Sequence, residues 1–223
     1  MRQALLALGL LFALVTAAYA DAAWQEGVHY FKVQPPQATN VPAGKVEVVE
    51  VFSYACPACN LFYPVIDKLK SSLPARAQLV YLPASWHPEE DWKTFQRAFF
   101  AAQSLGLVER THDALFDAIW KSGELATMDP VTHRPKAQMP TIVDAANFYA
   151  RIAHVTPEAF LAAAHSFGVD ASMRQADAVI EAYQADQTPT IIVNGKYRLT
   201  PRSAGGNDQF LELVKWLVAR EGG

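Results

Sequence analysis

The sequence is poor in cysteine, because its 223 residues include only Cys56 and Cys59. A structural zinc site takes four protein ligands, and the six histidines show no HxxxH-like pairing that could complete one. A disulfide between these two cysteines would close a very short loop, so it would constrain the unfolded chain little and stabilise the fold weakly. Both a metal site and a purely structural disulfide are therefore disfavoured.

Basic runs are absent as well. The net charge is −3, and the Lys and Arg residues form no run along the chain, which disfavours nucleic acid as the main partner. No internal repeat and no low-complexity tract stands out. The sequence does contain 51% hydrophobic residues and five Trp, which can build a substantial core in one large domain or in a domain with an insertion.

One apolar stretch lies at the N-terminus, over residues 4–15. It is shorter than the ~20 residues of a membrane-spanning helix, and Ala18-Tyr19-Ala20 after it has the small-x-small pattern of a cleavage site. We predict that residues 1–20 are a signal peptide cleaved near Ala20-Asp21, with an uncleaved membrane anchor as the alternative. No cysteine lies near this point, which disfavours a lipid anchor. In an oxidising compartment, a protein with one CxxC is expected to act on the disulfides of other proteins.

The motif Cys56-Pro57-Ala58-Cys59 lies where a predicted strand, residues 46–52, meets a predicted helix, residues 60–70. Residues three apart share a helical face, so the two sulfurs can form a disulfide without backbone movement. The unpaired N–H groups and the positive dipole end of the helix favour a thiolate on Cys56. Pro57 suits the first helical position, which needs no N–H donor. The motif therefore predicts a dithiol that cycles between reduced and oxidised forms.

The flanking segments predict an α/β fold. Residues 29–33 and 78–82 are typical of strands, and Leu61 belongs to the apolar positions at helical spacing in the helix after the CxxC. Near the C-terminus, two short strands flank Asn194-Gly195, the strongest hairpin signal in the chain. Residues 207–220 then predict an amphipathic helix.

Residues 91–186 have an almost wholly helical pattern. Trp92 with Phe95 and Phe99 forms an apolar stripe that we assign to the core rather than to a peptide groove. Thr141 resembles the start of a capping box. We expect Gly168 to end one helix of this block and Asp170 to cap the next.

These features together resemble the DsbA family. The resemblance rests on the signal segment, the CPxC at a strand–helix junction, the helical insertion, and Thr188-Pro189 before the TIIVNGKY hairpin. Members are periplasmic thioredoxin-fold enzymes that introduce disulfides into exported proteins. The resemblance implies a thioredoxin-like domain of residues 21–90 and 187–223 with an all-helical insertion of residues 91–186. The last helix of the insertion could pack with the thioredoxin part.

The resemblance also implies how the site is built. Pro189 would be cis and would pack beside the CxxC, although most X-Pro bonds are trans. The backbone of Thr188 could then pair with an extended substrate segment, and Thr188 could also contact the sulfurs. Cys56 would form the mixed disulfide with a substrate, and Cys59 would close or resolve it.

Three further residues are expected to tune the cysteines. Pro57 shapes the helix start, and Ala58 stands where the family most often has histidine, so we expect Cys56 to be acidified less strongly and the protein to be a milder oxidant. Glu50 could be a buried carboxyl with a raised pKa that exchanges a proton with Cys59. The alternative is a solvated acid on an open sheet face.

We predict a periplasmic thiol:disulfide oxidase that needs no metal and no cofactor besides its own redox-active disulfide. Its expected partners are reduced or folding exported proteins, and the resemblance implies a quinone-linked, DsbB-like membrane protein that reoxidises it. One alternative is an isomerase or reductase of the same fold, but such enzymes usually carry an added dimerisation domain, and the short N-terminal segment before residue 46 favours a monomer. A metal-binding or chaperone module that contains a CxxC is a second alternative.

Overall fold

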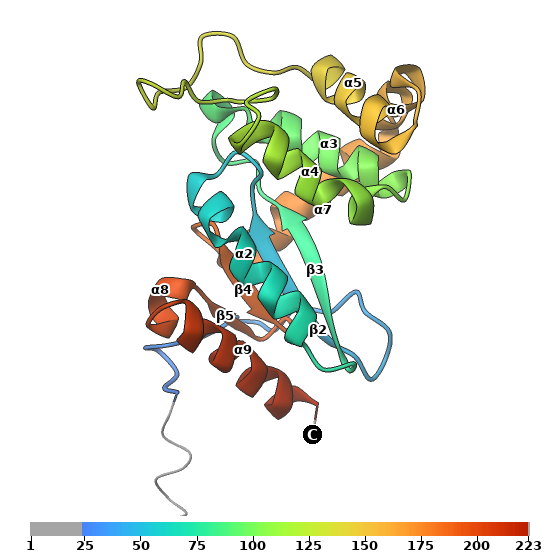
Figure 1. Ribbon diagram of the computed structural model, residues 1–223. Helices are drawn as coiled ribbons and strands as arrows, with labels where there is room; N and C mark the ends of the chain where they lie inside the picture. The colour runs from blue at the N-terminus through green and yellow to red at the C-terminus, as the bar shows by residue number, and fades with distance from the viewer. Residues whose placement is uncertain (1–23, 223) are drawn as a thin grey trace, which may run out of the picture.

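The computed structural model describes residues 24–222, and the predicted signal peptide lies outside them. Its centre is a five-stranded sheet with the strand order β1-β5-β4-β2-β3 (Figure 1). The strands are β1 (Phe31–Lys32), β2 (Val46–Phe52), β3 (Ala77–Pro83), β4 (Thr190–Val193) and β5 (Tyr197–Leu199). The sheet is mixed, because β2 runs parallel to β3 and antiparallel to β4.

The helices surround this sheet in two groups. They are α2 (Pro57–Ser72), the short 3-10 helix η1 (Pro88–Glu90), α3 (Trp92–Ser104), α4 (Val108–Trp120), α5 (Ile142–Ala153), α6 (Pro157–Ala164), α7 (Phe167–Ala182), α8 (Pro201–Ala204) and α9 (Asn207–Glu221). Helices α3 to α7 lie between β3 and β4 in the sequence, and α3 to α6 gather at one end of the sheet (Figure 1). Helices α2 and α9 cover one sheet face, and α7 packs on the other beside β3.

Strand β2 separates the two cores, and all seven of its residues are buried. Successive strand residues point to opposite faces of a sheet. Val46 and Val48 therefore pack with α2 and α9, whereas Val49 and Val51 pack with the helical block. The predicted apolar stripe on α3 lies in this second core, because Trp92, Phe95 and Phe99 are all buried. Two covered faces explain why β2 is nearly continuous in apolar residues.

Some of the helix and strand ends predicted from local sequence signals agree with the structure, and others differ. The strand predicted over residues 46–52 is confirmed residue for residue, and Thr141 does open a capping box. The first strand is only Phe31–Lys32, shorter than predicted. Gly168 does not end α6, and Asp170 does not cap α7. The hydroxyl of Ser166 is the cap instead, so Gly168 falls inside the first turn of α7, where one glycine is tolerated.

The predicted hairpin joins β4 to β5. Asn194 and Gly195 have φ values of 53° and 64°, the left-handed pair that a two-residue turn requires. A Cβ atom at Gly195 would also collide with the backbone carbonyl of Gln37. Glycine is therefore required there for both backbone conformation and space. The turn fixes the register of β4, the strand that follows Pro189.

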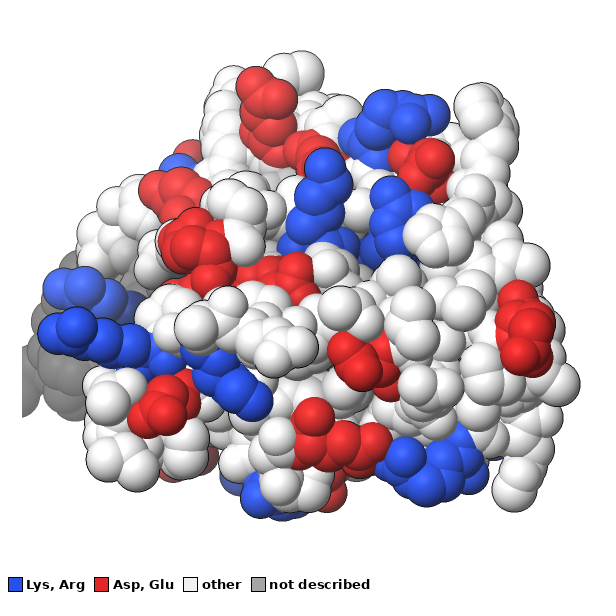
Figure 2. Space-filling model, turned by 90° about the horizontal axis from the view of Figure 1, so that it is seen from above, with Lys and Arg blue, Asp and Glu red and all other residues white. Residues whose placement is uncertain are grey.

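The charged surface is mixed in sign on the face seen in Figure 2. Lys and Arg side chains alternate with Asp and Glu, with uncharged areas between them. A nucleic-acid interface usually gathers basic side chains into a continuous surface, whereas the basic side chains on this face are bordered by acidic ones. Within residues 24–222, no helix has both the length and the apolar character needed to cross a membrane.

Candidate active site

The two cysteines lie at the start of α2, directly after the loop that follows β2. Cys56 is the N-cap residue, Pro57 occupies the first turn, and Cys59 follows within it. Both cysteines are free thiols, with 6% of Cys56 and 1% of Cys59 exposed. Proline is accepted at this position because the first helical N–H groups have no partner inside the helix. The sulfur at the helix end is thus the one that solvent and a substrate can reach.

Thr188 and Pro189 lie against this sulfur, although Thr188 is 132 residues away from Cys56 in the sequence. They immediately precede β4, which pairs with β2, so the two strand ends bring the segments together. The Thr188–Pro189 peptide bond is cis, which confirms that prediction. The Thr188 hydroxyl donates a hydrogen bond to Cys56 Sγ at 3.1 Å, and the Cys56 sulfur lies 3.8 Å from the Thr188 carbonyl oxygen.

The surroundings of the two sulfurs shift their pKa values in opposite directions. The pKa of Cys56 is lowered to about 6, chiefly by a hydrogen bond from the Cys59 thiol, while burial acts in the opposite direction. The Thr188 hydroxyl and the backbone N–H groups of Cys59 and Ala58 also contribute to the lowering. Burial and the hydrogen bond to Cys56 raise the pKa of Cys59 well above its ordinary value. Near neutral pH the pair therefore holds one thiolate, on Cys56, and one thiol, on Cys59.

Removing the Thr188 hydroxyl tests this arrangement. Thr188→Val keeps the shape of the side chain but deletes the donor, so we expect the pKa of Cys56 to rise by ~1, as the loss of one hydrogen bond to a charged group implies. Titration of the thiolate by its ultraviolet absorbance measures this pKa. Thr188→Ser keeps the donor and is the matched control, so an equal change in both variants would contradict the assignment.

Glu50 lies beneath the site on β2, on the sheet face opposite to that of Val49 and Val51. It is 3% exposed and is paired in register with Tyr81 on β3 and Ile191 on β4, so it is not the solvated acid of the alternative interpretation. Burial raises its pKa to about 8, and the negative charge on Cys56 contributes in the same direction. Its charge also raises the pKa of Cys59.

An aromatic cluster holds the loop between β2 and α2. The Tyr54 hydroxyl is 2.7 Å from His112 Nδ1, and the His112 ring stacks on Tyr81 at 4.1 Å between centroids. Burial lowers the pKa of His112 to about 3, so its imidazole is neutral. Trp120 Nε1 donates to the Tyr54 carbonyl oxygen at 2.7 Å, which ties the helical block to the active-site loop. No role for His112 was predicted from the sequence, although it shares the helical spacing of the buried Leu115 on α4.

A cavity of about 310 Å³ opens beside the cysteines. Ten residues from three segments line it: Ala58, Leu61, Phe62, Gln187, Thr188, Pro189, Thr200, Pro201, Arg202 and Asn207. Leu61 was expected on the apolar face of α2, but it is 79% exposed and the buried stripe is formed by Cys59, Phe62, Ile66 and Leu69 instead. An exposed leucine beside a cavity next to the reactive sulfur can contact an apolar substrate side chain.

No cluster of three or more His, Cys, Asp or Glu side chains within residues 24–222 could hold a metal ion. The groups that converge on the site are two thiols, a hydroxyl, a buried carboxyl and backbone N–H groups. This set suits thiol–disulfide exchange, in which a thiolate attacks one sulfur of a disulfide and another thiolate leaves.

Known proteins are similar to this chain in both sequence and structure. The thiol:disulfide interchange protein DsbA of Pseudomonas aeruginosa is 34% identical over 218 residues, which cover 98% of this chain and 94% of that protein. The crystal structure of P. aeruginosa DsbA matches with a TM-score of 0.75 at 33% identity, over 90% of this chain and 96% of its own. That of DsbA from Xylella fastidiosa matches with a TM-score of 0.74 at 30% identity, over 86% and 95%. No family model matches the chain.

Proposed function

Because this chain belongs to the DsbA family of thiol:disulfide interchange proteins, with their thioredoxin-like fold and helical insertion, we propose that it introduces disulfide bonds into exported proteins. The observation that supports oxidation rather than reduction of substrates is the low pKa of Cys56, about 6. A thiol of low pKa is a good leaving group, so a disulfide that contains it is readily transferred. Stabilisation of the reduced form in this way is what makes DsbA a strong oxidant.

The reaction balances with the groups at the site. In the oxidised protein, a substrate thiolate attacks Cys56 Sγ, the Cys56–Cys59 bond breaks, and Cys59 leaves with the electron pair. A second substrate thiolate then attacks the substrate sulfur of the mixed disulfide and releases Cys56 as a thiolate. The substrate has lost two electrons and gained a disulfide, and the protein holds the dithiol.

Glu50 supplies the proton that the buried sulfur needs. Cys59 is 1% exposed and has a raised pKa, so it must be protonated when it leaves. A carboxyl whose pKa is about 8 holds a proton near neutral pH and can give it up to a departing thiolate. In the reverse direction the same carboxylate would take the proton back.

The substrate would lie along the Thr188 backbone with a side chain in the cavity beside Leu61. Extended segments bind by adding main-chain hydrogen bonds at a sheet edge, with pockets that select side chains. Reduced or folding exported proteins would be the substrates, and a quinone-linked, DsbB-like membrane protein would reoxidise the dithiol. The chain would act as a periplasmic monomer after cleavage near Ala20-Asp21, without an added cofactor.

We also propose that the chain divides as its sequence indicates, into residues 21–90 with 187–223 and the insertion of residues 91–186. Three contacts support an active-site role for this insertion as well as a structural one. Its Trp120 binds the Tyr54 carbonyl, its His112 binds the Tyr54 hydroxyl, and α7 packs on the sheet beside β3.

Two assays on one preparation test the direction of the reaction. The protein should rapidly oxidise a reduced, unfolded model protein and should reduce insulin only feebly. Efficient insulin reduction with slow oxidation would instead support a reductase. Rescue of a scrambled model protein at a rate above that of simple oxidation would support an isomerase.

Substitution of Ala58, the third residue of the motif, tests how the helix start affects the redox equilibrium of the cysteine pair. The Ala58 side chain is exposed at the helix start, and its backbone N–H lowers the pKa of Cys56. Ala58→His would add a donor and a partial positive charge beside the thiolate. We expect the equilibrium with glutathione to shift ~10-fold toward a more oxidising protein, as a pKa lower by one implies. Ala58→Gln is a matched control for side-chain size, and a histidine variant that is no more oxidising than wild type would contradict this role.

A further inference from the structure

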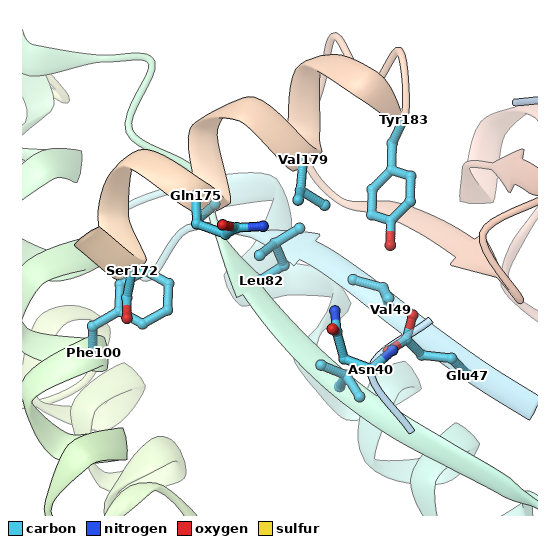
Figure 3. A pocket seen from close by; sticks show the side chains of 11 residues that line it. Asn40, Glu47, Val49, Leu82, Phe100, Ser172, Gln175, Val179 and Tyr183 are labelled. Carbon is cyan, nitrogen blue, oxygen red and sulfur yellow. The ribbon is translucent and has the colours of Figure 1, made fainter. Parts of the chain in front are cut away.

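A second cavity lies on the other face of the sheet, away from the cysteines. It has a volume of about 280 Å³ and is lined by residues of β2, β3 and α7, with the chain around Asn40 on one side (Figure 3). Its walls are largely apolar, with Val80 and Leu82 from β3 and Val179 from α7. Because Glu47 and Glu50 are three residues apart on β2, they point to opposite faces. Glu47 therefore belongs to this cavity and Glu50 to the active site.

Glu47 is an unusual residue for such a wall, because it is a carboxyl that is only 1% exposed. Its Oε1 accepts a hydrogen bond from the backbone N–H of Asn40 at 2.9 Å. Its Oε2 is buried and has no partner within the described part of the protein. Burial raises the pKa of this carboxyl, because an apolar environment disfavours its charged form. An acceptor buried without a donor loses the hydrogen bonds that water would give it, and this loss is larger for a charged group.

The remaining lining residues restrict which kind of ligand could donate a hydrogen bond to Glu47 Oε2. None of the lining residues is Lys, Arg or His, so the cavity itself offers Glu47 no cation. Figure 3 shows the Tyr183 side chain descending from the end of α7 with its hydroxyl directed toward the Glu47 side of the cavity. Asn40 and Gln175 are exposed, so the cavity opens to solvent between them. The cavity beside the unpartnered acceptor is thus open to solvent, and its lining combines a hydroxyl with apolar walls.

We propose that this cavity binds a small primary amine, with the ammonium group on Glu47 and the apolar chain between β3 and α7. A primary ammonium has three donors, enough for Glu47 Oε2 and the Tyr183 hydroxyl together. An anion would be repelled by the carboxylate, and a neutral apolar molecule would leave Oε2 unsatisfied. The proposal does not rest on the thiol chemistry, because it uses neither cysteine and none of the residues around them.

Calorimetric titration of the mature, reduced protein with pentylammonium tests this proposal. We expect saturable binding, with 1-pentanol, the matched neutral ligand, bound at least ~10-fold more weakly, as loss of one charged hydrogen bond implies. Glu47→Gln should remove the preference for the amine, and Glu212→Gln, which changes an exposed acid on α9, should leave it intact.

A second variant tests whether the ligand occupies the cavity, and it keeps the carboxylate of Glu47. Val179→Phe would fill the space between α7 and β3, so it should abolish binding of both ligands while circular dichroism and the thermal midpoint report a folded protein. Equal affinity for amine and alcohol, binding that Glu47→Gln leaves unchanged, or no binding of pentylammonium at millimolar concentration would each overturn the proposal. Thiol oxidation by these variants is measured separately, so failure here leaves the oxidase function untouched.

Discussion

Cys56→Ser is expected to abolish disulfide transfer, with oxidation of a reduced model protein slowed at least ~1000-fold, to the uncatalysed rate. The variant cannot form the Cys56–Cys59 disulfide, and a serine hydroxyl is neither ionised near neutral pH nor able to form a mixed disulfide. The change is nearly isosteric, and Cys56 is an N-cap residue, a position that serine favours. We therefore expect the fold to survive, and a thermal midpoint close to that of wild type would establish that the loss is chemical.

Cys59→Ser is the matched variant, and it should fail in a different way. It keeps the thiol at the helix start but has no second sulfur to displace a bound substrate. Mixed disulfides of Cys56 with glutathione or substrate should accumulate and be visible by mass spectrometry, whereas Cys56→Ser should form few because Cys59 is 1% exposed. If the two variants trapped partners equally, the assignment of Cys56 as the attacking sulfur would be wrong.

The sequence predicted the position of the cysteine pair, between β2 and α2, because the signals for that position are local. A run of β-branched residues, a proline at the first helical position and a three-residue spacing all lie within β2 and α2, so short-range rules apply. The contact of Cys56 with Thr188 is different, since it depends on β4 pairing with β2 across 132 residues. No local rule gives that pairing, and only the family resemblance suggested it.

The errors have physical causes of the same kind. Leu61 fits an apolar helical pattern, but the space beside it is a cavity rather than a packed core, and spacing alone cannot tell the two apart. Glu47 was not singled out at all. Like Glu50 it interrupts an apolar strand, but the covering of its face by α7 depends on the fold of the whole insertion. Whether a polar residue on a strand is buried depends on which helix packs on its face of the sheet, and the local sequence does not show this.

Glu50→Gln should make the protein more stable at high pH. Burial raises the folded-state pKa of Glu50 from 4.5 to about 8, so the stability associated with this group is fully present below pH 4.5 and is lost as the pH rises through about 8. The accumulated loss is on the order of 5 kcal/mol, at ~1.4 kcal/mol for each tenfold change in ionisation. Glutamine does not titrate, so the variant should gain that amount over wild type across this pH range.

Urea unfolding of the oxidised proteins between about pH 4.5 and about pH 8 measures this difference. The oxidised form is required because the Cys56 thiol of the reduced form titrates within the same range with the opposite sign. Its pKa is lowered to about 6, so its contribution is lost as the pH falls through about 6. Without that thiolate, burial remains the main cause of the raised pKa of Glu50. Glu212→Gln, at an exposed position on α9, should give the pH dependence of wild type.

The same substitution should slow catalysis, because glutamine can neither give a proton to Cys59 nor take one from it. We expect disulfide transfer at neutral pH to fall ~10-fold or more, at the low end of general acid–base effects, since water reaches a nearly buried sulfur only partly. The pH dependence of the rate separates this from a structural effect. A wild-type profile with an inflection near pH 8 that Glu50→Gln removes would identify the carboxyl as the proton carrier. A uniformly slower variant with the inflection retained would assign the proton transfer to another group.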